Sequence, residues 1–350
     1  MQLIRRIVFL FCLTGMGLFR SYGQGPADAV FNVKQYGATG DGHTPDTRSF
    51  NNAIAACVKA GGGTVLVPAG TFVTGTFQLF SNINLQLSAG AVILASENEE
   101  DYLLQADYGF GGSGAGGKRL GIIFAVNAVN VSITGTGTID GRAEAFMYLD
   151  SVQVSNPEDG KYARQGRNYM NQPAGRKDAP VMWKGEWIKR PGTQIIFHSC
   201  KKVLLRDITI RNANDWTIDL NACDDAKVLG ISIDNNMSVP NSDGIDMYDS
   251  RNVIIADCDI RAGDDAIAVV STSNLKVSNC NLWSRSCGIR IGYNGFNDHN
   301  SGNLLFDNIR IYGSNRGVGI FQRRKGDMEN MLFSNMIIDT RLYPGQWWGH

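Results

Sequence analysis

The chain has 350 residues, enough to bury a large core in one long domain or two. Lysine plus arginine and aspartate plus glutamate number 33 each, so net charge favours neither nucleic acid nor a membrane surface as a partner. The 41 glycines and the 9 % aromatic content fit a turn-rich all-β chain better than a helical one.

The first residues have the pattern of a secretory signal. Arg5 and Arg6 precede an apolar stretch over 7–19, and small or polar residues follow at 21–24. The apolar stretch is short for a membrane span. We predict a signal peptide over 1–24, a secreted or periplasmic location and no membrane span; the alternative is a buried first helix.

One stretch near the N-terminus has a helical pattern. It runs from Asp46 to Ala60, where Asp46 or Thr47 could cap its start and Gly61 could end it. A helix here would cover the open end of a stack of strands, whose exposed edge otherwise invites aggregation.

Strand-like runs recur along the second half of the chain. Their last apolar residues stand at positions 210, 233, 260, 282, 311 and 338, a nearly regular spacing. This repeat, with alternating apolar residues and Asn, Asp or Gly turns, predicts a solenoid of β-coils. The Leu-x-x-Leu-x-Leu pattern of leucine-rich repeats is absent. We predict an all-β fold, a right-handed parallel β-helix over 25–350 with an N-terminal capping helix.

Two segments depart from the repeat. Residues 142–190 show no coil pattern and are interpreted as a long excursion. Between 156 and 190 they hold eight Lys or Arg against four Asp or Glu, which suits either a cationic wall for an acidic saccharide or a solvated loop. The sequence also ends soon after a repeat without a closing cap, so we expect a C-terminal truncation.

Six cysteines remain beyond the predicted signal peptide. No Cys-x-x-Cys pair or His/Cys cluster suggests a metal site. We expect most of them to pack in the coil interior as small apolar residues. They are Cys57, Cys200, Cys223, Cys258, Cys280 and Cys287.

Two carboxylate clusters are about one coil apart. The first lies in Asn241-Ser242-Asp243-Gly244-Ile245-Asp246, and the second is the pair Asp264-Asp265, one repeat further along the chain. Successive coils stack at roughly 4.8 Å, so Asp243, Asp264 and Asp265 should meet on one face, where repulsion makes some of them retain protons. Glycoside hydrolysis needs such carboxyls, one to protonate the leaving oxygen and one to activate water. The alternative is that they only cap turns.

These clusters and other motifs carry a family resemblance. The motifs are Phe31-Asn32-Val33-Lys34-Gln35-Tyr36-Gly37-Ala38, residues 61–70, Gly135-Thr136-Gly137-Thr138-Ile139-Asp140-Gly141, and Asn214-Asp215-Trp216. From about residue 29 to its end, the chain resembles glycoside hydrolase family 28, the polygalacturonases and related pectin-degrading hydrolases.

The resemblance implies a pectin-lyase-like solenoid that hydrolyses an α-linked uronic-acid polymer with inversion. By this resemblance, Asp265 is the general acid, and Asp243 and Asp264 are the groups that activate water. Acid and base of inverting enzymes are ~6.5–9.5 Å apart, a separation that neighbouring coils can supply. We expect an acidic polysaccharide as substrate, no cofactor or metal, and a monomer. Asn241 and Asp246 are candidate substrate-binding residues, although a structural role is equally open for Asp246.

The sequence departs from the family at two places. Where the family carries Gly-His-Gly, this chain has Ser286-Cys287-Gly288, and a thiol is a poor substitute for imidazole. The family's Arg-Ile-Lys motif, thought to grip the sugar carboxylate, corresponds to residues 317–321, which hold neither cation. Arg290 is a candidate replacement, on the same outer face as Asp246, and Cys287 joins it as a candidate substrate contact. The alternative for Arg290 is a salt bridge to Asp246 or Asp265.

Two other functions are open. A non-catalytic carbohydrate-binding β-helix would explain the missing His and Arg-Ile-Lys, but not the three retained aspartates. A polysaccharide lyase shares the architecture but uses β-elimination, typically with Ca²⁺ and a cationic base.

Overall fold

The computed structural model describes residues 29–108, 119–148, 182–183, 190–237, 239, 241–293, 299–322 and 325–341. The predicted signal peptide, most of the excursion at 142–190 and the C-terminal end lie outside the described residues. Within the described ranges, every helix is too short or too polar to cross a bilayer.

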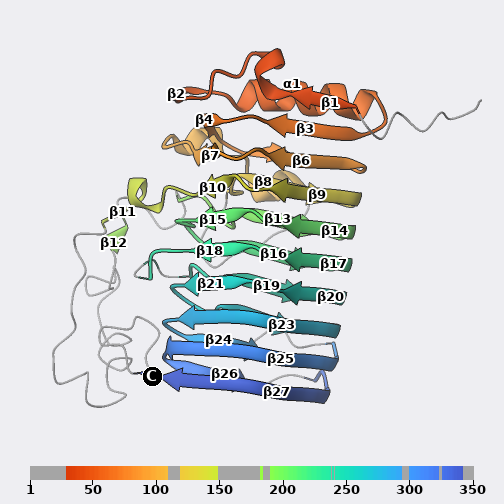
Figure 1. The fold of residues 1–350 in the computed structure, drawn as a ribbon, viewed down its shortest axis with the longest axis vertical. Coiled ribbons are helices and arrows are strands. Elements are labelled where there is room, and N and C mark those ends of the chain that lie inside the picture. The colour runs from red at the N-terminus through yellow and green to blue at the C-terminus, as the bar shows by residue number, and fades with distance from the viewer. Residues whose placement is uncertain are drawn as a thin grey trace, which may run out of the picture.

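Parallel strands stack into a solenoid (Figure 1). Within the described residues, three rows of strands form a 17-stranded and an 8-stranded sheet. The first row contains β1 (Val30–Asn32), β3 (Gly63–Val67), β6 (Ile83–Leu87), β9 (Val129–Gly135), β14 (Lys201–Arg206), β17 (Asp224–Leu229), β20 (Arg251–Ala256), β23 (Ser273–Ser284), β25 (Ser301–Ser314) and β27 (Met328–Thr340).

The second row belongs to the same sheet and joins the first through β23, which pairs with both β20 and β21. It contains β2 (Asp41–Pro45), β4 (Gly70–Thr74), β7 (Ala91–Ala95), β10 (Thr138–Asp140), β15 (Thr209–Arg211), β18 (Ser232–Asp234) and β21 (Asp259–Ala262).

The third row is the separate 8-stranded sheet, and it carries the residues of functional interest. It contains β5 (Phe77–Gln78), β8 (Ile123–Val126), β13 (Ile195–His198), β16 (Ile218–Asn221), β19 (Ile245–Tyr248), β22 (Ile267–Val270), β24 (Cys287–Ile291) and β26 (Arg316–Ile320). Outside the rows lie the antiparallel pair β11 (Met147–Tyr148) and β12 (Met182–Trp183), and the 3₁₀ turns η1 (Val33–Tyr36), η2 (Glu99–Asp101), η3 (Gln105–Tyr108) and η4 (Ala143–Ala145).

The repeated positions found in the sequence pair with one another in the sheet. The expected run ends pair directly with one another across successive coils, and their side chains alternate with outward-facing ones. They are Ile210, Ile233, Ile260, Leu282, Ile311 and Ile338. The predicted parallel β-helix is therefore confirmed.

The interior of the solenoid is apolar and continuous. Branched aliphatic residues from all three rows form one buried cluster along the stack. The six cysteines beyond residue 24 are all buried and unbridged, as expected for small apolar residues in a coil interior.

The predicted N-terminal helix is α1 (Thr47–Lys59), which packs against β1 and β3 at the first end of the stack (Figure 1). The expectation for its cap needs correction. Asp46 occupies the N-cap position, but its carboxylate accepts hydrogen bonds from the backbone N–H groups of Thr39 and Gly40 instead. Thr47 Oγ1 accepts from Gly75 N at 2.9 Å, so both side chains tie the helix to neighbouring turns.

Asparagine ladders hold the exposed corners of the coils. Asn252, Asn274, Asn303 and Asn330 all adopt left-handed backbone angles, with φ between 53° and 58°. Asparagine tolerates this conformation better than most residues. Each side-chain amide from Asn274 onward donates to the amide oxygen one coil earlier, at 3.0–3.3 Å. The ladders therefore satisfy polar groups at a corner and reinforce the register.

Two adjacent leucines of β14 give a direct test of the register. Leu205 is completely buried in the core, while Leu204 points outward and is partly exposed. We expect Leu205→Ala to lower the free energy of unfolding by about 2–5 kcal/mol, because it leaves a cavity, and Leu204→Ala to lower it much less. Urea midpoints of both variants check this. Equal losses would contradict the assigned register.

Candidate active site

The two carboxylate clusters lie at one edge of the third sheet, in equivalent positions of successive coils. Ile245 pairs with Ile267, and Ile267 pairs with Ile289. Asp243, Asp265 and Cys287 each stand two positions before one of these isoleucines and therefore form a column.

The coils that carry this column are shorter than the coils that flank them. The steps from Ile245 to Ile267 and from Ile267 to Ile289 are equal in length. The preceding step, from Ile218 to Ile245, and the following one, from Ile289 to Val318, are both longer. The strand pairing within the third sheet is the same in all of these coils, so the difference in length arises outside the paired residues of that sheet.

Glycines let these coils approach closely. A Cβ atom on Gly244 would lie 2.3 Å from the carbonyl oxygen of Ala266 in the next coil. A Cβ atom on Gly263 would lie 2.5 Å from the carbonyl oxygen of Val239. Both contacts are shorter than real Cβ atoms allow, which explains why a glycine adjoins each carboxylate cluster.

Asp243, Asp264 and Asp265 come together as expected. Carboxylate oxygens from the three residues lie within 4.8 Å of one another. Asp243 and Asp265 are 2 % and 5 % exposed, whereas Asp264 is partly exposed. Two unit charges at this distance repel by roughly 3–4 kcal/mol at an effective dielectric constant of about 20.

Carboxyl groups this close together can share hydrogen bonds to one water molecule. A water molecule has two protons to donate, so it can pair with two carboxylates and accept from a third that keeps its proton. The arrangement suits a hydrolytic water beside a proton donor.

A second column of the same sheet carries charges of both signs. Asp219 pairs with Asp246, Asp246 with Ala268, Ala268 with Arg290, and Arg290 with Gly319. The short side chain of Ala268 leaves room for Arg290 to reach back over one coil. Arg290 Nη2 lies 3.6 Å from Asp246 Oδ1.

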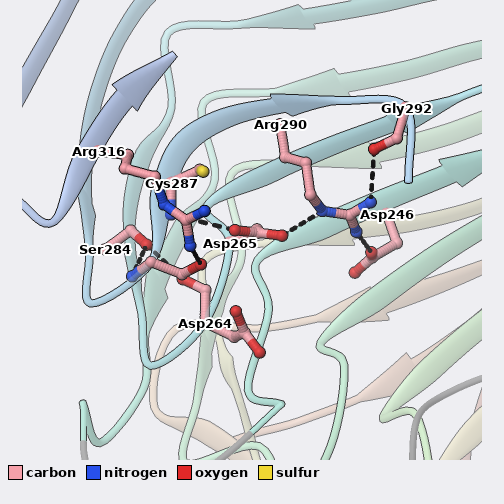
Figure 2. Close-up of polar contacts among 9 residues, drawn as sticks. Asp246, Asp264, Asp265, Ser284, Cys287, Arg290, Gly292 and Arg316 are labelled. Carbon is pink, nitrogen blue, oxygen red and sulfur yellow. Dashed lines mark hydrogen bonds and ion pairs between the residues drawn. The ribbon is translucent and has the colours of Figure 1, made fainter. Parts of the chain in front are cut away.

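Arg290 is a buried counterion, not a free guanidinium. It is 5 % exposed, and its Nε donates to Asp265 Oδ2 (Figure 2). Its Nη1 donates to the carbonyl oxygen of Gly292 at 3.1 Å, and its guanidinium lies 4.6 Å from the ring centre of Tyr293. The salt-bridge alternative for Arg290 is thus confirmed with both Asp246 and Asp265.

The clustering of carboxyls raises their pKa values. Burial, followed by the neighbouring charge of Asp265, raises the pKa of Asp264 to about 8. Burial and then the charges of Asp246, Asp264 and Asp265 raise the pKa of Asp243 well above its usual value. Burial also raises the pKa of Asp246, against the attraction of Arg290. At neutral pH, some of these groups therefore hold protons.

The other candidate residues are buried and contact neighbouring groups of the protein. The Cys287 thiol is buried, and burial raises its pKa, so it is a neutral thiol. Its backbone N–H donates to Asp265 Oδ1 at 3.0 Å. Asn241 has a left-handed φ of 57°, and its Oδ1 accepts from Arg190 Nη2 at 3.4 Å. Asp246 is fully buried, which favours its structural role.

Sequence reasoning gave no role in the site to four residues around it. Asp219 lies under Asp246, and its place between Ile218 and Leu220 repeats the pattern of Asp246 one coil later. Arg190 follows the long excursion and lies 3.6 Å from Asp215, an ion pair with no sequence signal. Trp216 and Tyr248, the last residue of β19, stack with ring centres 5.5 Å apart. The repeat period could have found Asp219, since it aligns with Asp246.

Comparisons with known proteins agree on one family. The model of Glycosyl hydrolases family 28 matches residues 57–344. A probable polygalacturonase of Vitis vinifera is 30 % identical over 247 residues, which are 69 % of this chain and 44 % of that protein. An exo-poly-alpha-D-galacturonosidase of Dickeya chrysanthemi is 28 % identical over 83 % of this chain and 48 % of its own. The chain thus spans less than half the length of these relatives.

Solved structures share the fold. The Yersinia enterocolitica family 28 exopolygalacturonase superposes with a TM-score of 0.65 at 20 % identity, covering 89 % of this chain and 66 % of its own. This likeness supports the predicted fold class, a right-handed, pectin-lyase-like β-helix.

Asp264 gives a prediction for stability against pH. Its folded pKa of about 8 exceeds the unfolded value of about 3.9, so the folded state binds more protons between these values. Stability should therefore fall as pH rises from about 4 to about 8. We expect Asp264→Asn to raise the free energy of unfolding at pH 8 by roughly 2–5 kcal/mol and to change it little at pH 4.

Urea unfolding at both pH values measures this difference. The matched control is Asp224→Asn, because hydrogen bonds from Arg251 and Asn252 lower the pKa of Asp224 to about 2. That variant should be less stable than the parent above pH 5, the opposite sign. A destabilised Asp264→Asn at pH 8 would contradict the raised pKa.

Proposed function

Because the chain belongs to glycosyl hydrolases family 28, we propose that it hydrolyses glycosidic bonds in an acidic, pectin-like polysaccharide that contains α-linked galacturonic acid. The observation that carries this proposal is the trio Asp243, Asp264 and Asp265, whose oxygens lie within 4.8 Å of one another. The substrate class rests on the relatives, which are named for polygalacturonase and galacturonosidase activity.

The chemistry needs one carboxylic acid and one carboxylate. The acid protonates the glycosidic oxygen as its bond to C1 breaks, and the carboxylate takes a proton from the water that attacks C1. Raised pKa values of Asp243 and Asp264 supply a proton near neutral pH. The family resemblance makes Asp265 the acid, with Asp243 and Asp264 activating water.

We propose inversion at C1, as the family resemblance implies. Inversion requires a water molecule that one carboxylate activates, and the three carboxyls that meet here include more than one group that could bind it. The nearest oxygens of the three carboxyls lie within 4.8 Å of one another, a proximity of single atoms that leaves retention open. Retention is therefore the alternative, and the anomer formed first distinguishes the two.

Two contacts argue against a lyase. A lyase needs a cationic base that can lose its proton, whereas the carboxylates around Arg290 outweigh the effect of its burial and raise its pKa well above the usual value. Ca²⁺ would also have to compete with the guanidinium already bound to Asp265. We assign no metal site here.

The trio also argues against a binding protein without turnover. Binding of a sugar does not require carboxyls that hold protons near neutral pH, whereas hydrolysis does.

We further propose that the protein acts outside the cytoplasm. The support is the charged, then apolar, then small-residue pattern over 1–24. The expected substrate, a polymer too large to enter a cell, agrees with export. Cell fractionation of the full chain, beside a variant lacking residues 2–24, tests this directly.

Substitution of the trio tests catalysis. We expect Asp243→Asn, Asp264→Asn and Asp265→Asn each to lower reducing-sugar release from polygalacturonan by about 10²–10⁴-fold, because each removes a proton-transfer group. The matched control is Asp225→Asn, since Asp225 is 48 % exposed and far along the coil in β17. A panel with rhamnogalacturonan and other acidic polysaccharides identifies the substrate. Unchanged release in all three variants would refute the site.

Product analysis tests the reaction type. We expect the reducing-end anomer opposite in configuration to the cleaved bond to form first, as seen by proton NMR early in the reaction. The same spectra should contain no unsaturated sugar. The retained anomer would establish the alternative stereochemistry, and an unsaturated product would establish elimination.

A further inference from the structure

Trp216 continues the column of the active site toward the N-terminal end of the stack. It stands two positions before Ile218, which pairs with Ile245, so it occupies, one coil earlier, the position of Asp243. The strand that follows it, β16, lies directly beside β19 in the stack (Figure 1). An aromatic residue therefore takes the place next to the trio in the column.

Trp216 is the one partly exposed residue in a buried segment. Every other residue from Ala213 to Leu220 is buried. Exposure of a single aromatic side chain is common on protein surfaces and does not by itself mark a site. Here the ring partner of Trp216, its link to the trio and its fixed backbone together point to a ligand.

The indole of Trp216 lies on a second ring. Trp216 and Tyr248 are stacked, with ring centres 5.5 Å apart and ring planes inclined by 10°. Tyr248 is 8 % exposed, whereas Trp216 is partly exposed, so the pair presents the indole and not the phenol to solvent. Because a second ring supports it from one side, the indole offers its remaining surface as a flat platform.

Direct contacts connect this aromatic pair to the trio. The Tyr248 hydroxyl accepts a hydrogen bond from the Arg290 guanidinium. Arg290 also donates from Nε to Asp265 Oδ2. The platform and the carboxyls therefore share one buried cation, which fixes their positions relative to one another.

The backbone on both sides of Trp216 is held by buried polar contacts. Arg190 Nη1 donates to the carbonyl oxygen of Asn214 at 2.6 Å, and Thr217 Oγ1 donates to the carbonyl oxygen of Asp243 at 2.6 Å. Arg190, Asn214 and Thr217 are each 3 % exposed or less. A platform that is already ordered binds a ligand at a lower cost in conformational entropy.

A sugar ring fits such a platform. One face of a pyranose ring carries mainly C–H groups, which pack against an aromatic ring, while the hydroxyl groups at its edge stay free for polar contacts. Successive coils are about 4.8 Å apart, which is close to the length of one sugar unit in a polysaccharide. A polymer lying across the coils would therefore place neighbouring sugars over the trio and over Trp216.

We propose that Trp216, supported by Tyr248, is a sugar-stacking subsite that positions the polysaccharide one sugar away from the bond that is cleaved. The proposal rests on the proposed hydrolase function. Trp216 takes no part in proton transfer and acts by binding and orienting the polymer.

Binding without turnover tests the subsite directly. The background is Asp265→Asn, and the ligands are oligosaccharides of increasing length from polygalacturonan and from rhamnogalacturonan. In this background, we expect Trp216→Leu to lower the highest affinity found by calorimetry about 10–100-fold, because leucine keeps an apolar contact with Tyr248 but has no flat ring. Trp216→Phe should recover most of that loss. Equal affinity with and without Trp216→Leu, or no binding by the background protein, overturns the proposal.

Trp283 provides the matched control. It is also partly exposed, but its ring lies in β23 between the Arg261 guanidinium, 4.4 Å from the ring centre, and the Tyr312 ring, 5.7 Å away. Trp283→Leu should leave the affinity for every oligosaccharide unchanged. An equal loss in Trp283→Leu and Trp216→Leu would mean that the effect is not local to the column, and would overturn the proposal.

Tryptophan emission gives a readout that a purely structural role would not move. A sugar on the indole excludes water, so emission of the Asp265→Asn protein should shift to shorter wavelength when a saturating oligosaccharide is added. The shift should be absent when Trp216→Phe is added to this background, although that variant still binds, and present when Trp283→Phe is added instead. A shift that persists in Trp216→Phe places the sugar elsewhere and overturns the proposal.

Turnover separates the subsite from the hydrolase function. On the polymer that the parent cleaves best, Trp216→Leu should raise KM about tenfold or more and leave kcat within about threefold, because stacking is equally strong in the ground state and the transition state. An unchanged KM overturns the subsite while the hydrolase function stands. No release from any polymer by the parent refutes the hydrolase function, and the binding measurement then decides the subsite by itself.

Discussion

In-register pairing of β19, β22 and β24 holds equivalent residues of successive coils one above another, about one strand spacing apart. The backbone hydrogen bonds of the sheet leave no freedom to slide, because a slip by one position would turn the buried isoleucines outward. Whatever stands two positions before those isoleucines must therefore form a column. Asp243, Asp265 and Cys287 meet for this reason, and not through any attraction between their side chains.

Electrostatics then determine what the column can do. Repulsion between buried carboxyls keeps protons in the site, while the strand pairing prevents the carboxyls from moving apart. Arg290, two coils from Asp246 in the neighbouring column, relieves part of that repulsion through its ion pairs with Asp265 and Asp246. One guanidinium among several carboxyls thus makes them chemically unequal, and acid–base chemistry requires such inequality. The remaining repulsion between the carboxyls destabilises the fold locally, as is common for active sites.

The sequence was sufficient for the fold and for the members of the trio. Period and alternation revealed the register, because a solenoid repeats one local pairing and each coil contacts only its neighbours. The same period placed Asp243 and Asp265 together. It offered Asp246 and Asp265 as partners of Arg290 but could not decide between a salt bridge and a sugar contact, since the reach of a long side chain across a coil depends on the intervening residue, Ala268. Both outcomes for Arg290 were open until that geometry was known.

Other features were beyond sequence reasoning for similar reasons. The ion pair of Arg190 with Asp215 joins segments with no shared period. The bonds of the Asp46 carboxylate to residues 39 and 40 depend on the path of a turn, although a helix N-cap was the better expectation from spacing. In both cases the partner of a polar side chain depends on how distant parts of the chain approach one another, which only the folded structure shows.

The unequal lengths of the coils have a consequence for evolution. The carboxylates stand on short coils, and a longer coil adjoins them on either side. Extra residues in the flanking coils lie outside the paired residues of the third sheet, so these segments can lengthen, shorten or change composition while the carboxylates stay in place. Insertions and deletions in these flanking segments can therefore accumulate during evolution without loss of the carboxylate column.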